Sequence, residues 1–138
     1  MDATDLVFPV ICFSQGIFEV MEDLGKLTTC NTLGLKRGWY DGLLIIDSLG
    51  KSVLVKSARK LHGVGRFWGY NIFLNQRIKV ELTYEGKPFQ TTVEDVRKRV
   101  LDSLSTWEGW QEQINFEEWK ASFEKASTVA KIIRLAGS

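Results

Sequence analysis

The sequence predicts an α+β fold: a mainly antiparallel β-sheet of about four to six strands over residues ~6–84, followed by two or three helices packed on it. Two patterns predict this. Residues 78–84 alternate apolar and polar side chains with the period of a strand, whereas apolar positions from residue 93 onward follow the 3.6-residue period of a helix. Because the strands precede the helices, α+β is favoured over a parallel βαβ sheet. At 138 residues, we expect a single domain over residues 1–138.

The first strands are predicted near the N-terminus. Residues 6–13 are nearly all apolar, which predicts a strand buried on both faces, with Pro9 placing it at a sheet edge or a bulge. Residues 14–16 (Ser-Gln-Gly) predict a turn, and residues 17–22 a second short strand. Residues 24–40 contain three glycines and no clear period, so we expect an irregular segment with at most one helical turn.

The strongest strand signal is the run of aliphatic residues at 43–46. Residues 47–51 (Asp-Ser-Leu-Gly-Lys) have turn chemistry and residues 52–56 start a return strand, so this region predicts a hairpin. A turn is also expected at residues 85–88 (Glu-Gly-Lys-Pro). The alternation before that turn predicts one face made of Ile78, Val80, Leu82 and Tyr84, and a second face made of Lys79, Glu81 and Thr83.

Helical segments follow the predicted sheet. The first, residues ~92–105, has a continuous apolar side, and Thr91 with Glu94 has the spacing of a capping box. The second, residues ~116–126, begins near Asn115. The third, residues ~128–136, has Ser127 as a candidate N-cap and ends at Gly137, which we expect in the left-handed conformation. The same pattern also fits a continuation of the second helix.

Composition limits the class of protein. The net charge of +1 argues against a general attraction to nucleic acid or anionic lipid. No apolar run approaches the length of about 20 residues needed to cross a bilayer, and the acidic N-terminus does not resemble an export signal. We therefore expect no membrane association and a cytoplasmic location. Cys12 and Cys30 are expected to be free thiols in a reducing compartment.

Few residues are available for catalysis. His62 is the only histidine, which excludes any site that needs two imidazoles from one chain. A small enzyme that pairs His62 with an acid or a thiol stays open. Asp41 and Asp47 flank a predicted strand and two glutamates stand at residues 117–118, but turn and helix-start roles explain these acids better. We assign no catalytic residue, no metal ligand and no cofactor.

The segment between the predicted hairpin and residue 78 is the candidate binding surface. Five residues of this region that can carry positive charge fall within eleven positions, from Lys56 to Arg66, and aromatic residues follow at once. This combination holds phosphates and stacks bases, and it also suits a protein partner. In the alternative interpretation, the rings belong to the core and the basic residues form a solvated rim. The predicted partner-binding residues are Lys56, Arg59, Lys60, His62, Arg66, Trp68 and Tyr70, with Trp107 and Trp110 as a second patch.

Charge is unevenly distributed although it nearly cancels. Residues 1–24 carry about −5, residues 25–66 about +6, and residues 107–124 about −4. Such a bipolar chain suits steering toward a charged protein partner, with internal pairing as the alternative. The leading hypothesis is a non-catalytic protein-binding module, comparable in size and type to immunity or inhibitor proteins that occlude a partner. The alternative is binding of nucleic acid or a phosphate ligand through residues 56–70.

Overall fold

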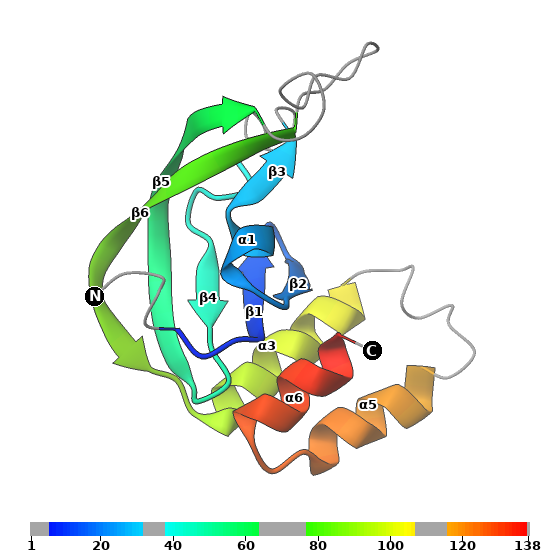
Figure 1. The fold of residues 1–138 in the computed structure, drawn as a ribbon. Helices are drawn as coiled ribbons and strands as arrows, with labels where there is room; N and C mark the ends of the chain where they lie inside the picture. The colour runs from blue at the N-terminus through cyan, green and yellow to red at the C-terminus, as the bar shows by residue number, and fades with distance from the viewer. Residues whose placement is uncertain (1–5, 32–37, 64–76, 107–115, 138) are drawn as a thin grey trace.

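The computed structural model describes residues 6–31, 38–63, 77–106 and 116–137, and it has the predicted α+β arrangement (Figure 1). Six antiparallel strands form one curled sheet in the order β2-β1-β4-β5-β6-β3, and helices follow it in the chain. The described elements are β1 (Val10–Ser14), β2 (Ile17–Met21), α1 (Leu24–Leu27), β3 (Thr29–Asn31), β4 (Leu44–Ile46), β5 (Lys51–Gly63), β6 (Arg77–Gln90), α3 (Val93–Thr106), α5 (Phe116–Lys125) and α6 (Val129–Ala136).

Strands β1 and β4 lie inside the sheet and are buried on both faces, as their apolar runs predicted. Successive side chains of a strand point to opposite faces, so Cys12 enters one core and Ile11 the other. The expectation that Pro9 puts this strand at an edge or a bulge was wrong. Pro9 comes immediately before the first residue of β1, where its missing N–H removes no ladder hydrogen bond.

The first core fills the concave face of the curled sheet. The segment before β1, helix α1 and the residues before β4 close this face, and the hydroxyl of Tyr40 donates to the carbonyl oxygen of Leu27 at 2.8 Å. Its buried members are Leu6, Val10, Cys12, Leu27, Tyr40, Leu43, Ile45, Val53, Val55, Ile78 and Val80.

The second core lies between the opposite face of the sheet and helices α3, α5 and α6 (Figure 1). Helix α3 contacts β2, and α6 contacts both β1 and β2. Its buried members are Ile11, Leu44, Ile46, Val96, Val100, Leu104, Phe123, Ala126, Val129, Ile132 and Ile133.

Local signals at the N-terminal end are largely confirmed. Gln15 and Gly16, both with positive φ (54° and 79°), form the two-residue turn between β1 and β2. One helical turn, α1, follows, and the Asp23 side chain caps it by accepting from the Lys26 N–H at 2.8 Å. Strand β3 was not expected, because three residues are too few to show a period and only their pairing with β6 makes them a strand.

The hairpin of β4 and β5 is confirmed, and its turn is built on Asp47. One carboxylate oxygen, Oδ1, accepts from the N–H groups of Leu49 and Lys51, both at 2.9 Å. The other, Oδ2, accepts from the N–H of Val7 at 3.0 Å. Asp47 is fully buried, so these three donors satisfy a carboxylate that would otherwise be costly to bury.

Strands β5 and β6 are longer than predicted. The return strand was predicted only over residues 52–56, but β5 continues as far as Gly63, and residues 85–88 do not reverse the chain. Ser52 pairs with Phe89 while Leu54 pairs with Glu85, so residues 86–88 form a bulge in a continuing strand. Gly86, at φ 71°, accommodates the bend. The alternation over residues 78–84 is confirmed, with its apolar side on the first core.

The predicted C-terminal helical segments are confirmed, with differences at their ends. The hydroxyl of Thr92, not Thr91, caps α3 by accepting from the Asp95 N–H at 3.2 Å, because Thr91 is buried in a hydrogen bond to Ser52. Thr128, not Ser127, caps α6, which is a separate helix from α5. The expected left-handed Gly137 was wrong.

Gly137 has φ −89°, a backbone conformation that other residues also adopt. A glycine is favoured here because the neighbouring side chain leaves little room for a Cβ atom. A Cβ atom on this residue would lie 3.2 Å from Cγ1 of Val20. The end of α6 therefore packs closely on β2.

Arg97 ties α5 to α3. Its Nε donates to the carbonyl oxygen of Phe123 at 3.1 Å, and its Nη2 donates to that of Ala126. Both carbonyls lie at the C-terminal end of α5, where carbonyl groups lack partners within the helix and a positive charge is favoured.

We expect Arg97→Met to lower the free energy of unfolding by about 2 kcal/mol, because hydrogen bonds to charged groups are worth roughly 1.5–3 kcal/mol. Urea denaturation followed by circular dichroism measures this. Arg99→Met, at an exposed position of the same helix, is the matched control and should change the value by less than about 0.5 kcal/mol. Equal effects of the two substitutions would show that the hydrogen bonds from Arg97 to the end of α5 do not stabilise the fold.

Candidate functional site

The predicted basic cluster is only partly described. Lys56, Arg59 and Lys60 lie on β5 and are exposed. Arg59 stands opposite Glu81 of β6 and forms an ion pair with it at 2.5 Å, the two side chains being 74% and 55% exposed. Ion pairs this exposed contribute little to stability.

The remaining predicted residues are not brought together by what the structure describes. His62 belongs to β5 by its backbone, where it pairs with Lys79. The structure does not describe the side chain of His62. Outside the described residues lie Arg66, Trp68, Tyr70, Trp107 and Trp110. Their assignment to partner binding therefore stays a prediction.

The acidic and basic segments lie on different parts of the sheet. Glu19 belongs to β2 at one edge of the sheet, whereas Lys56, Arg59 and Lys60 belong to β5, three strands away. This separation is about 14 Å at the usual strand spacing. Among the described residues, Glu19 and these three basic residues are therefore too far apart to pair directly.

Both cysteines are reduced, and neither has the environment of a nucleophile. Burial raises the pKa of the Cys12 thiol far above its ordinary value, and the nearby Glu19 carboxylate adds to the rise. Burial also raises the pKa of the half-buried Cys30, against a smaller opposite effect of its hydrogen bond with Tyr40. Because the thiolate is the reactive form, the pairing of a cysteine with His62 gains no support from these groups.

The described parts of the chain were searched for metal-binding and membrane-spanning features. They contain no group of three or more His, Cys, Asp and Glu side chains that could hold a metal ion. Within the same ranges, no helix has the length and apolar character required to cross a membrane.

A groove of about 450 Å³ lies where the helix layer stops covering the sheet. Its floor is a row of apolar side chains on neighbouring strands: Phe13 stands opposite Leu44, which stands opposite Leu54. The lining continues outward to Ile17 on β2 and Phe89 on β6, which are 40% and 44% exposed. The groove therefore crosses five adjacent strands, and large apolar groups at both ends are open to solvent.

The walls of the groove are polar. Arg99, Asp102 and Ser103 of α3 form one wall, since residues three and four positions apart share a helix face. The turn at residues 14–16 and the pair Asp41 and Gly42 complete the lining. The charged groups along this lining are two carboxylates and one guanidinium.

Sequence reasoning did not identify this groove. The floor residues were correctly read as strand residues facing a core, but the extent of helix cover over them is not visible in a strand pattern. Asp41 was considered only as a partner of Asp47, and the two have different environments, Asp41 exposed in the groove and Asp47 buried in its turn. The one available signal was Phe89, an aromatic residue directly after Pro88, the last residue of the predicted turn.

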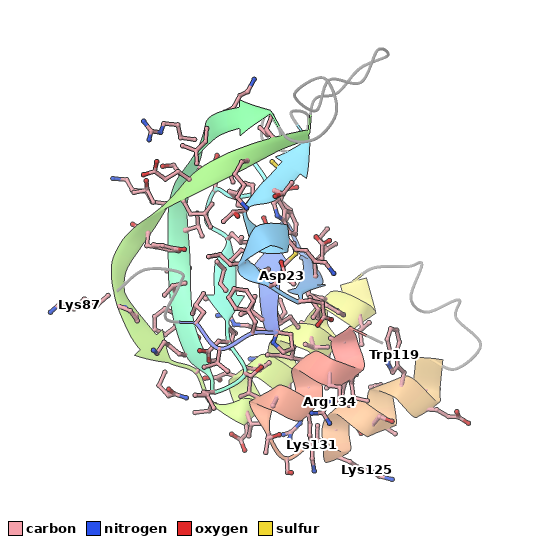
Figure 2. The ribbon with its side chains drawn as sticks, viewed as in Figure 1. Asp23, Lys87, Trp119, Lys125, Lys131 and Arg134 are labelled. Atoms are coloured by element: carbon pink, nitrogen blue, oxygen red, sulfur yellow. The ribbon has the colours of Figure 1, made fainter. Side chains whose placement is uncertain are left out.

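A second hollow, of about 340 Å³, lies between α6, strand β2, Pro9 before β1 and Ser48 in the β4–β5 turn. Glu22 and Arg134 line it with opposite charges. Figure 2 shows Arg134 and Lys131 on α6 near Lys125 on α5. None of its lining residues is an exposed large apolar residue, so it is a weaker candidate than the groove.

Comparisons with known proteins add no relative from which a role can be transferred. No family model, no curated protein and no solved structure matches the chain. Function is therefore inferred from the residues themselves.

We expect both thiols to react slowly with iodoacetamide in the folded protein at pH 8, Cys12 more slowly than Cys30, and quickly after unfolding in urea. In the folded protein the rate should rise with pH above 9, because the thiolate fraction grows only as pH approaches the raised pKa. Mass spectrometry of the Cys12→Ser and Cys30→Ser variants separates the two sites. Fast labelling of Cys12 at pH 8 in the folded protein would contradict the buried position of this side chain.

Proposed function

We propose that this protein is a non-catalytic protein-binding module of the inhibitor or immunity type, and that the groove between α3 and the sheet is its contact surface. The observation that carries the proposal is the pair Ile17 and Phe89, large apolar residues exposed at the two ends of a groove with an apolar floor. Exposed apolar surface of this kind, bordered by polar groups, is typical of interaction sites.

The composition of the groove supports a protein partner. Aromatic side chains are enriched at interface hot spots, and here Phe13 lies in the floor while Phe89 stands at an end. A polar rim with Arg99 and Asp102 around an apolar centre is the usual anatomy of a specific interface. One groove is smaller than a standard interface, so a partner would also contact the surrounding strands and α3.

The charge distribution supports the same proposal. Glu19 on β2 and the basic residues Lys56, Arg59 and Lys60 on β5 are exposed and stand about 14 Å apart at the usual strand spacing. A surface with separated charges orients an approaching charged partner and raises the association rate. The near-neutral total limits attraction to a uniform polyanion such as nucleic acid.

Binding of nucleic acid or a phosphate ligand through β5 is the second candidate. The exposure of Lys56 and Lys60 favours it. Glu81 argues against this second candidate, because its carboxylate stands beside Arg59 and reduces the positive potential around β5 and β6.

Phe89→Asp should abolish capture of the partner, because a carboxylate would replace an apolar anchor. The experiment immobilises the full chain, passes a lysate of the source organism over it, and compares the retained proteins by mass spectrometry. Leu49→Asp is the matched control: Leu49 is 68% exposed in the β4–β5 turn and does not line the groove. Circular dichroism verifies folding of both variants.

A partner that wild type and Leu49→Asp retain and Phe89→Asp loses is the expected result. Retention by all three proteins would remove the groove as the contact surface. Recovery of nucleic acid in place of protein, lost on raising the salt concentration, would favour the second candidate.

A further inference from the structure

We infer that the groove binds an extended segment of the partner, about five or six residues long, in which apolar side chains are flanked by lysine or arginine. This inference rests on the proposed function and specifies the chemistry of the partner. It is argued from the length of the groove, its apolar floor and its charge.

The length of the groove fits an extended peptide. Its lining comes from five strands that are neighbours in the sheet, from Ile17 on β2 to Phe89 on β6. At the usual strand spacing this is about 19 Å, which an extended chain spans with about five or six residues. The exposed ends at Ile17 and Phe89 allow a longer polypeptide to enter and leave.

The floor offers sites for apolar side chains at intervals. Phe13, Leu44 and Leu54 lie on three successive strands, about 4.8 Å apart. Side chains on one face of an extended peptide recur every second residue, at about 6.6 Å, so about two of them fit along this floor. The other side chains of the peptide point toward the rim.

The rim favours positive charge on those side chains. Asp41 and Asp102 bring two carboxylates to the groove and Arg99 one guanidinium, so the lining keeps a negative excess whichever contact Asp102 makes. Asp102 and Ser103 lie near the C-terminal end of α3, whose carbonyl groups add negative potential, and the last turn of α3 carries no basic residue. Long basic side chains reach such rim carboxylates while their stems cover apolar surface.

The test uses immobilised hexapeptides whose apolar residues alternate with lysine and arginine, with aspartate and glutamate, or with serine and asparagine. The purified full chain should be retained by the basic set and not by the acidic set, with the neutral set between them. Fluorescence anisotropy of the best basic peptide then gives a dissociation constant.

The double substitution Asp41→Asn and Asp102→Asn should weaken binding of that peptide about five-fold and flatten its salt dependence, because rim charges act mainly through screened attraction. Glu124→Gln, an exposed acid on α5 outside the groove lining, is the matched control and should bind like the wild type. Phe89→Asp should bind the basic peptides no more tightly than the wild type, since its new charge cannot replace the lost apolar contact.

Equal or stronger retention by acidic or neutral peptides, or no retention by any set, would overturn the inference about charge and extended shape. If a partner were still captured through Phe89 in that case, the proposed function would stand without it. Sedimentation velocity tests whether a second copy of this chain occupies the groove. A concentration-dependent dimer that Phe89→Asp abolishes would show that it does, and this result would also overturn the inference. Capture that does not depend on Phe89 would instead remove the proposed function.

Discussion

The hydrogen bonds between the β4–β5 turn and the segment before β1 set the register on which both cores depend. Asp47 accepts from the N–H of Val7, and Ser48 exchanges bonds with the same segment, its N–H donating to the Val7 carbonyl and its hydroxyl to that of Pro9. Apolar alternation cannot fix this register, because β1 and β4 are apolar on both faces. The polar contacts decide which side chains face the helices and which face the concave side.

The long pairing of β5 with β6 shows how tertiary contacts override local sequence preferences. Residues 85–88 have the composition of a turn, and Gly86 does adopt a positive φ. The chain nevertheless continues as a strand, because pairing on both sides of the bulge satisfies backbone groups that a reversal would have to satisfy elsewhere. This continuation places Phe89 across from Ser52 and beside the floor of the groove.

The groove itself results from a mismatch between a wide sheet and a narrow helix layer. Helices α3 and α6 contact β1 and β2, while the sheet extends through β4 to β5 and β6 (Figure 1). Where the layer ends, Phe13 and Leu54 are only partly covered, and α3 presents a charged side above them. An apolar floor and a charged wall therefore adjoin without any dedicated motif in the sequence.

The sequence by itself determined the α+β class, the strands with clear periods, the β4–β5 hairpin, the helical character of the C-terminal segments and the turn role of Asp47, because periodicity and turn chemistry are local. That α5 and α6 are two separate helices became clear only from the structure. The sequence also identified basic and aromatic residues, of which Lys56, Arg59 and Lys60 are exposed on β5. Only the tertiary structure decided that β3 is a strand, that residues 85–88 bulge, and that Asp41, Asp102 and Phe89 line one groove. These features arise from contacts between residues far apart in the chain, and no local pattern records which strands a helix layer leaves uncovered.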